Sequence, residues 1–525
     1  MRTRKLHARE PGDPGQRPPD RRAGQERPVA NNPDAYVAGK SDIGIVPVNP
    51  PNNACQPAAE VGEGRPVPKG NPVHLTESRT QGWSDESHKL DWVREAARQD
   101  RHKCFTALLH HLTPHLLMES FAALRKDAAS GVDAMTCAQY TEGLAGRLLD
   151  LHDRVHSGRY RAKPSKRIYI EKDDGRLRPI GIAALEDKIV QKAVMRILEA
   201  IYEVDFRPFS HGFRPQHSQH NALDALWVGI RHRKVNWVLD ADIRGFFDAL
   251  DHECLMNFLA IRIGDQRILR LVRKWLTAGI SEGGQWSATT VGTPQGAVIS
   301  PLLANVFLHY TLDQWGDEWR KTQARGDVII VRYADDFVMG FQYEKEAKEF
   351  LDALRERLRE FHLELHPDKT RLIEFGRFAE RDRSKRGQGK PETFDFLGFT
   401  HWCSTTRKTG KFILRRKPVA KRVRKKLKEI KETLMKRRHL PVAEQGRWLQ
   451  SVVRGYFAYF AVPGTSEILS AFRKHVSRLW LRALRRRSQK KGRRLTWKRF
   501  ERLIDTWIPK MKILHPYPDE RLTVR

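Results

Sequence analysis

The sequence has few cysteines and arranges none of them as a pair. The five cysteines of the 525-residue chain are scattered and odd in number, and none of them is in a C-x-x-C spacing. This pattern argues against a disulfide framework and against a cysteine-based zinc site. Because disulfides are absent from most proteins of reducing compartments, we expect this protein in the cytoplasm.

Long hydrophobic runs are missing as well. No apolar stretch approaches the roughly 18 residues that a membrane-spanning helix needs. No apolar segment typical of a secretory signal follows the N-terminus. We therefore expect neither secretion nor a membrane partner.

Acidic residues are the third shortage. Lysine and arginine number 96 against 63 aspartates and glutamates, which gives a formal net charge of +33. Such an excess favours a polyanionic partner, and nucleic acid is the first candidate. The alternative is a basic protein that binds polyanions without specificity, as a ribosomal-type binder would. Hydrophobic residues make up 40% of the chain, which suits a globular protein.

The composition and the spacing of apolar residues change along the chain. Residues 1–80 are rich in proline, glycine and charge, so we expect disorder there. Residues 85–160 have apolar positions at three- and four-residue spacing, including CFTALLHHL from residue 104, which predicts helices. Residues 161–410 mix helical and β-rich stretches, whereas residues 411–525 predict basic helices. The expected fold class is α+β.

Two short strands are predicted in SKRIYIEKDDGRLRPIGI, around a turn at residues 173–175. Farther along, VNWVLDADI predicts a strand, and DVIIVRYADDFVMGF predicts a strand, a tight turn and a second strand. Long amphipathic stretches between them predict helices. Strands and helices of the middle segment therefore alternate irregularly, as in α+β proteins.

Two adjacent carboxylates, Asp335 and Asp336, interrupt the apolar stretch VRYADDFVMG. A two-residue turn would present both at the tip of a hairpin. Neighbouring carboxylates repel, so both stay ionised only beside strong positive charge, and oxygen ligands favour magnesium. The alternative is an ordinary solvent-exposed Asp-Asp turn.

A third carboxylate favours the metal site. Asp242 ends an apolar strand in VLDADIRGFFDALDH, and Asp240 lies on the same face two residues earlier. Spacing alone leaves the choice between them open. Carboxylates from two separate elements that hold a pair of metal ions are typical of in-line phosphoryl transfer.

With ADIRGFFDALDH, GTPQGAVISPLLANVFLHYTLD and YADD in this order, the chain resembles the reverse transcriptases encoded within bacterial group II introns. Upstream, SHGFRPQHSQHNAL is similar to an opening block of that family. Downstream, FDFLGFTH is similar to a closing palm block, and WLQSVVRGYFAYFAVPGT to the thumb and maturase region. The resemblance covers roughly residues 85–520. It implies a right-hand polymerase with a helical N-terminal region (85–160), fingers and palm (161–410) and an α-helical thumb or maturase domain (411–525).

The resemblance also implies roles for individual residues. The family's metal-binding aspartates correspond to Asp242, Asp335 and Asp336, which settles the choice over Asp240 and implies two Mg²⁺ ions per active site. Lys369 corresponds to a basic residue near the palm. The expected nucleotide-binding residues comprise a phosphate clamp, a bulky shield against a ribose 2′-hydroxyl and a glutamine near the incoming nucleotide: Lys172 and Arg178, Phe247, and Gln295.

The basic C-terminal segment is expected to contact RNA phosphates. The residues predicted to do so are Lys421, Arg422, Lys425, Lys426, Arg437, Arg438, Arg485, Arg486 and Arg487, the last three on a loop predicted for residues 484–494. Aromatic residues are interleaved there and either stack on unpaired bases or pack in a core, and their helical spacing favours packing: Trp448, Tyr456, Phe457, Tyr459 and Phe460.

The resemblance implies two activities, RNA-directed DNA synthesis and maturase action on the parent intron RNA, which together serve intron mobility by target-primed reverse transcription. The implied partners are group II intron RNA, an RNA template with a DNA primer, target DNA and dNTPs, and a homodimer is left open. The chain lacks the cysteine pairs of the family's H-N-H endonuclease, so we expect no cleavage of the second DNA strand.

Two rival functions remain at this point. A domesticated or defence-associated reverse transcriptase would share the same residues, and genomic context separates it from an intron-encoded protein. A non-polymerising RNA-binding splicing factor would have no need of three acidic ligands in a basic protein, so the intact aspartates argue against it.

Overall fold

In the computed structural model, the described residues are 45–47, 84–171, 175, 177–406, 408–487 and 495–524. Every described residue belongs to one compact unit, Lys40–Arg525. Within residues 1–80, Ile45–Pro47 form strand β1 and pair with β13 (Leu522–Val524), and the disorder expected for most of this segment stays a prediction. The rest of that segment lies outside the described residues.

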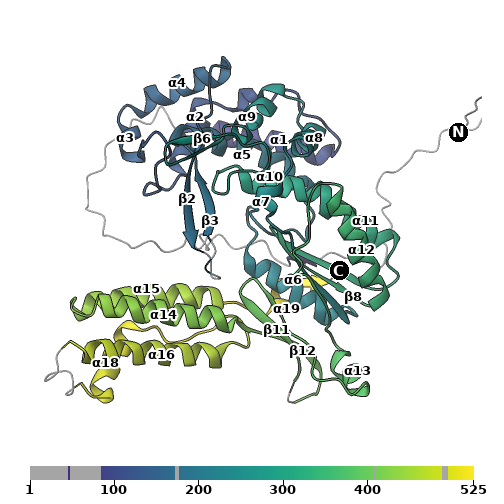
Figure 1. The fold of residues 1–525 in the computed structure, drawn as a ribbon, viewed down its shortest axis with the longest axis vertical. Coiled ribbons are helices and arrows are strands. Elements are labelled where there is room, and N and C mark those ends of the chain that lie inside the picture. The colour runs from purple at the N-terminus through teal and green to yellow at the C-terminus, as the bar shows by residue number, and fades with distance from the viewer. Residues whose placement is uncertain are drawn as a thin grey trace, which may run out of the picture. The chain divides into compact units, whose positions relative to one another are not determined.

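The N-terminal region is helical, as its periodicity predicts (Figure 1). Pro114 is the first residue of its second helix, where its missing N–H would have no helical partner. Thr113 caps this helix by accepting a hydrogen bond from Leu116 N at 3.1 Å. The helices of this region are α1 (Ser84–Gln99), α2 (Pro114–Ala122), α3 (Cys137–Thr141) and α4 (Leu144–His156).

The helix predicted for CFTALLHHL is wrong, except for the 3-10 turn η2 (Leu109–His111). Phe105 forms a parallel β-bridge with Ile263. The backbone N–H groups of Leu108 and Leu109 donate to Asp265 at 2.8 and 3.0 Å. Tertiary contacts therefore satisfy the backbone groups that a helix would have satisfied locally.

The fingers contain a four-stranded sheet with the order β3-β2-β5-β6. The predicted hairpin forms its first two strands, antiparallel from Lys166 opposite Ile182 to Glu171 opposite Leu177. Of the predicted turn, only Gly175 lies among the described residues. The strands are β2 (Ser165–Glu171), β3 (Leu177–Ile182), β5 (Ile280–Glu282) and β6 (Gln285–Ser287).

The palm contains a second four-stranded sheet, ordered β7-β8-β4-β9 and antiparallel throughout. Side chains alternate between its two faces. Val238 and Val338 pack with residues of α6, whereas Leu239 and Met339 pack with residues of α12. The strands are therefore apolar on both faces, and the elements involved are α6 (Gln219–His232), β4 (Trp237–Asp242), β7 (Val328–Tyr333), β8 (Asp336–Phe341), α12 (Glu344–Arg359) and β9 (Arg371–Glu374).

The helices that lie between the two sheets in sequence fill the core of the fingers and palm. α10 and α11 are joined by a π-helical turn, labelled η3, so they form one continuous helical segment. These elements are α5 (Leu185–Asp205), α7 (Phe246–Ala249), α8 (His252–Arg262), α9 (Gln266–Leu276), α10 (Ser300–Leu308), η3 (His309–Asp313) and α11 (Gln314–Thr322).

A three-stranded sheet, β10-β11-β12, leads into the C-terminal helices. The expected domain boundary between residues 410 and 411 lies between β11 and β12, which pair with each other, so the sheet spans it. The elements are α13 (Ala379–Lys385), β10 (Phe394–Phe396), β11 (Phe399–Thr405), β12 (Phe412–Pro418), α14 (Ala420–Lys436), α15 (Val442–Phe460), α16 (Ser466–Arg485), α18 (Trp497–Trp507) and α19 (Pro518–Arg521).

The C-terminal helices share a core of their own. The apolar stripe predicted on α14 packs into it, with Ile430 and Leu434 buried and Val423 and Leu427 at its edge. This leaves the lysines and arginines of α14 on the opposite face. Among the described residues, no helix is both long enough and apolar enough to cross a bilayer.

Candidate active site

The Asp-Asp motif lies at the tip of the β7–β8 hairpin. β7 ends at Tyr333, β8 begins at Asp336, and these two residues are register partners. The two-residue loop is therefore Ala334–Asp335, not the Asp335–Asp336 turn that the sequence predicts. Ala334 has a φ of +58°, which is the left-handed conformation that tight hairpin loops use to match the twist of their strands.

Asp242 lies directly opposite Asp336. It is the last residue of β4, and the register of β4 on β8 makes the two aspartates partners. Directly opposed residues of an antiparallel pair have Cβ atoms roughly 5 Å apart. Asp240 is on the same face of β4, but its register partner is Val338. The register therefore favours Asp242, which spacing alone does not distinguish from Asp240.

The carboxylates of this cluster raise one another's pKa values. Burial, followed by the charges of Asp240, Asp242 and Asp335, raises the pKa of Asp336 well above its usual range. Burial and Asp242 also raise the pKa of Asp335, against the opposing influence of Arg178. Burial is thus the main cause of both shifts, and the neighbouring carboxylates add to it.

Two cations of the described chain contact the cluster. Lys369 donates a hydrogen bond to Asp242, and Arg371 donates to Asp240 at 3.4 Å. Burial nevertheless raises the pKa of Asp240 to about 6. The backbone N–H of His366 donates to Asp242 O at 2.8 Å, which holds the segment that carries Lys369 against β4.

In the described part of the chain, no group of three or more histidine, cysteine, aspartate or glutamate side chains is close enough together to hold a metal ion. The three predicted ligands lie at the same end of the palm sheet, two of them on its inner strands β4 and β8, but they do not form such a group. The Lys369 ammonium is the positive charge in contact with Asp242.

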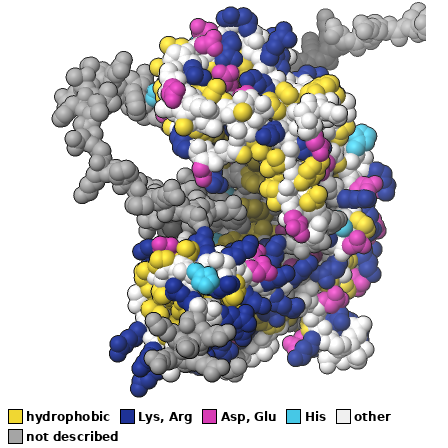
Figure 2. Space-filling model, turned by 60° about the vertical axis from the view of Figure 1, so that its left-hand side comes forward, with side chains coloured by type: hydrophobic (Ala, Val, Ile, Leu, Met, Phe, Trp, Pro, Cys, Tyr) yellow, Lys and Arg dark blue, Asp and Glu magenta, His cyan; other side chains and the backbone are white. Residues whose placement is uncertain are grey.

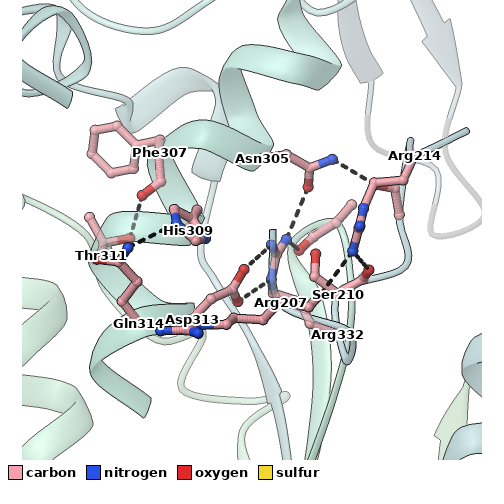
Figure 3. Close-up of polar contacts among 12 residues, drawn as sticks. Arg207, Ser210, Arg214, Asn305, Phe307, His309, Thr311, Asp313, Gln314 and Arg332 are labelled. Carbon is pink, nitrogen blue, oxygen red and sulfur yellow. Dashed lines mark hydrogen bonds and ion pairs between the residues drawn. The ribbon is translucent and has the colours of Figure 1, made fainter. Parts of the chain in front are cut away.

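A buried polar network lies behind the loop, and the sequence analysis missed it (Figure 3). The guanidinium of Arg332, which has no exposed surface, donates to both carboxylate oxygens of Asp313 at 2.7 and 2.5 Å. It also donates to Asn305 Oδ1 at 3.1 Å and to Ala334 O at 2.9 Å. The available signal was an arginine inside the otherwise apolar strand VIIVRY.

One loop, Gly292–Gly296, links two of the predicted nucleotide-binding residues. Thr293 N donates to Phe247 O at 2.8 Å, and the half-buried Phe247 ring packs at the edge of the main core. Gln295 O accepts from Gly181 N at 2.7 Å, which ties the loop to β3. The Gln295 side chain donates to the Asp248 carboxylate at 3.3 Å.

Arg178 is exposed on β3, the strand to which this loop is tied. Its charge acts to lower the pKa of Asp335, so it lies within electrostatic reach of the β7–β8 loop. The second member of the predicted clamp, Lys172, lies outside the described residues. The loop tied to β3 thus connects Phe247 and Gln295 to the strand that carries Arg178.

A cleft opens beside Asp336, between the palm and the first two C-terminal helices. Tyr333 and Asp336 line it from the palm, and Arg422 and Tyr459 line it from α14 and α15. Tyr459 donates a hydrogen bond to Leu397 O at 2.7 Å, which joins α15 to the segment between β10 and β11. Arg422, predicted as an RNA contact, therefore faces the site of the aspartates.

The other predicted RNA contacts differ in exposure. Lys421, Lys425, Arg485 and Arg486 are exposed. Figure 2 shows Lys and Arg side chains gathered on the lower part of its face. The remaining four are half-buried: Lys426, Arg437, Arg438 and Arg487.

The loop predicted for residues 484–494 is wrong at its start. Arg485 is the last residue of α16 and Arg486 is its C-cap. Arg437 also has a partner within the protein, because its guanidinium lies 5.4 Å from the ring centre of Trp448.

The aromatic residues of α15 are buried to different degrees. Tyr456 and Phe457 are buried in the C-terminal core, and Tyr456 stacks on Phe472 at 3.9 Å between ring centres. Trp448, Tyr459 and Phe460 are partly buried at the edges of two cores. The packing interpretation is therefore confirmed for Tyr456 and Phe457. For Trp448, Tyr459 and Phe460 the partial burial leaves part of each residue exposed, and Tyr459 also lines the cleft beside Asp336.

Two family descriptions match the chain, in the order of its domains. Reverse transcriptase (RNA-dependent DNA polymerase) matches residues 170–401, and the group II intron maturase-specific domain matches residues 420–502. The first range contains the whole palm sheet and all of the fingers sheet except the first residues of β2. The second contains α14, α15 and α16.

Several proteins are similar in sequence. Protein YkfC of Escherichia coli (strain K12) is 35% identical over 299 residues, which are 49% of this chain and 77% of YkfC. The group II intron-encoded protein LtrA of Lactococcus lactis subsp. cremoris is 44% identical over 228 residues, which are 42% of this chain but 37% of LtrA. An uncharacterized 91 kDa protein in the cob intron of Schizosaccharomyces pombe is 38% identical over 179 residues, 33% of this chain and 22% of that protein.

Reverse transcriptases use divalent metal ions, and the α+β palm, the register of its aspartates and the helical maturase domain agree with these matches. The chain therefore belongs to the group II intron-encoded reverse transcriptases, RNA-dependent DNA polymerases that also carry a maturase domain.

Proposed function

We propose that this protein polymerises DNA on an RNA template at Asp242, Asp335 and Asp336, with Mg²⁺ as its metal ion. The observation that carries the proposal is the register of Asp242 opposite Asp336, with Asp335 in the adjoining loop. Carboxylate oxygens are the ligands that Mg²⁺ prefers, so the donor set fits this ion. The raised pKa of Asp336 also fits, because a cation would stabilise its ionised form.

When bound, two Mg²⁺ ions supply activation of the primer 3′-hydroxyl and stabilisation of the leaving pyrophosphate. The three aspartates hold these ions at the end of the palm sheet. Lys369 neutralises part of the cluster through Asp242. The Lys369 ammonium is a point charge on a flexible side chain, so a divalent cation can replace it at the Asp242 carboxylate.

The nucleotide lies, in this proposal, between the carboxylates and the loop Gly292–Gly296. Arg178 binds the triphosphate, together with Lys172, which lies outside the described residues. Phe247 blocks the space that a ribose 2′-hydroxyl would need. Gln295 borders the same space from the loop, and its hydrogen bond to Asp248 holds it there.

Primer extension on poly(rA)/oligo(dT) with Mg²⁺ tests the polymerase proposal. Wild-type protein should incorporate dTTP, and Asp335→Ala and Asp336→Asn should each abolish incorporation. Asp368→Asn is the matched control, because Asp368 is an exposed carboxylate one residue from Lys369. Normal extension by Asp336→Asn, or none by folded wild-type protein, would contradict the proposal.

We propose that the second function is maturase action on the parent group II intron RNA. The match of residues 420–502 to the maturase-specific domain supports it, as does the basic face of α14. Phosphate contacts dominate such binding and make it salt-dependent. Target DNA would join the same complex during target-primed reverse transcription, and the bacterial cytoplasm is the proposed compartment.

Removing two lysine charges from α14 tests the proposed RNA-binding surface. The double variant Lys421→Gln/Lys425→Gln should bind intron RNA more weakly and reduce the slope of log K against log salt by about 2. The matched control is Lys345→Gln/Lys348→Gln on α12, whose lysine side chains are also exposed. An equal loss in both variants would show a nonspecific effect of net charge. Homodimer formation stays a prediction, which light scattering checks.

A further inference from the structure

Arg332 is a charged residue in a position that the fold otherwise gives to apolar side chains. It belongs to β7, between Val331 and Tyr333, and its side chain is fully buried. A buried charge is tolerated only where partners compensate it. Asp313 provides the opposite charge through two hydrogen bonds, and its own carboxylate is almost as deeply buried.

The same guanidinium reaches forward to the catalytic hairpin. Its Nη1 donates to Ala334 O at 2.9 Å, the residue with a φ of +58°. A left-handed backbone is unfavourable for any residue with a Cβ and persists only where its surroundings enforce it. Arg332 thus bonds directly to the strained residue that precedes Asp335.

A second layer of contacts on the loop comes from the segment that contains Gly212. Gly212 packs so closely on Ala334 that an added Cβ would lie 2.2 Å from Ala334 N. Asn305 joins the two layers, because its Nδ2 donates to Gly212 O at 2.6 Å and its Oδ1 accepts from Arg332 (Figure 3). His211 N also donates to Arg332 O at 2.8 Å.

The π-helical turn η3 presents Asp313 to this network. Gln314 N donates to His309 O, a bond one residue longer than in an α-helix. The wider turn frees carbonyl groups, and Arg357 of α12 donates to Tyr310 O and Thr311 O at 3.2 and 3.1 Å. Such π-helical turns are rare within α-helices, and those that occur are frequently at functional sites.

We propose that Arg332, held by Asp313 and Asn305, is a positioning residue that fixes the Ala334–Asp335 loop and thereby sets the affinity of the aspartates for their metal ions. The proposal rests on the proposed roles of Asp335 and Asp336. The alternative is that the network only stabilises the palm core. The two differ in what a conservative substitution does to metal binding at unchanged folding.

Arg332→Lys separates the two. Lysine keeps the charge beside Asp313, but it lacks the planar fork that also reaches Asn305 and Ala334. Mn²⁺ titration followed by electron paramagnetic resonance should show affinity reduced about tenfold or more. Hydrogen exchange in the peptide 331–338 should accelerate, and kcat should fall about tenfold with little change in the KM for dTTP.

The matched control is Arg320→Lys. Arg320 forms a 2.5 Å ion pair with Asp317 in α11 and is mostly buried, but it does not contact the hairpin. Arg320→Lys should lose about as much thermal stability as Arg332→Lys, but it should bind Mn²⁺ with wild-type affinity. Equal Mn²⁺ affinity in Arg332→Lys and wild type would overturn the proposal, as would losses that match the control.

If Arg332→Lys fails to fold, Asn305→Ala tests the positioning role instead. This variant breaks the hydrogen bond to Gly212 O and keeps the Arg332–Asp313 ion pair. It should weaken Mn²⁺ binding in the same way, and unchanged binding would overturn the proposal. Asp336→Asn distinguishes the two levels of inference. If it polymerises normally, the proposed function fails and the positioning role with it; if it is inactive while Arg332→Lys resembles wild type, the positioning role alone fails.

Discussion

The contact between Gly212 and the Ala334–Asp335 loop allows a prediction with a calculable size. In Gly212→Ala, the new Cβ would lie 2.2 Å from Ala334 N and 2.9 Å from Tyr333 C, whereas ordinary contacts begin at 3.4 Å. Both neighbours are backbone atoms, so neither can rotate away. Gly212 O is held by Asn305 at 2.6 Å, which opposes a retreat of residue 212.

The loop must therefore move by about 1 Å relative to Asp242. A displacement of that size at a reacting centre costs on the order of 100-fold in rate, or about 2.7 kcal/mol in the barrier. We expect kcat for single-nucleotide primer extension to fall by about this factor. The KM for the primer–template should stay close to that of wild type, because the binding surfaces are unchanged.

Gly146→Ala is the control, because nothing lies within 4 Å of the Cβ that it adds in α4. It should stabilise the protein by about 0.5–1 kcal/mol and leave kcat unchanged. A Gly212→Ala variant that folds and keeps kcat within about threefold of wild type would refute the reasoning, since the loop would then tolerate displacement.

Three further predictions concern other sites. Phe247→Ala should raise ribonucleotide incorporation relative to dNTP incorporation about tenfold or more in a competition assay, because it opens the space at the sugar. Asp224→Asn should lower the free energy of unfolding in urea by about 3–5 kcal/mol, because it leaves the buried guanidinium of Arg416 without its carboxylate. His401 is fully buried, which lowers its pKa to about 3. Since the unfolded chain takes up this proton below about pH 6.5, the protein should lose about 1.4 kcal/mol per pH unit there, and His401→Phe should remove this part of the loss.

Two of these predictions have a matched control variant, and the first has an outcome that would refute it. Unchanged sugar selectivity in a folded, active Phe247→Ala variant would remove Phe247 from the site. Asp352→Asn breaks an exposed ion pair with Arg355 and should cost less than about 1 kcal/mol. His475 is exposed, so His475→Phe should keep the wild-type dependence of the unfolding free energy on pH between 7 and 5. If His401→Phe also kept the wild-type dependence, His401 would not be the cause of this part of the loss.

Local sequence patterns predicted most of the helices and strands of the fold. The period of apolar residues predicted α5, α9 and α12, because a helix with one buried face repeats that face every three or four residues. The hairpin of β2 and β3 followed from two β-rich runs around a turn. The segment from Cys104 to Leu112 did not follow its pattern, because Asp265, more than 150 positions away, binds its backbone.

The site shows the same division. The sequence by itself determined that Asp242 ends one apolar strand and that Asp335 and Asp336 interrupt another, since strand ends are marked by local composition. The tertiary structure decided the register that opposes Asp242 to Asp336, the Ala334–Asp335 loop and the pairing of Asp242 with Lys369. It also decided that Arg332 meets Asp313 and Asn305, which come from a different helical segment. The partner of a buried charge follows from packing between elements, and packing between elements leaves no period in the sequence.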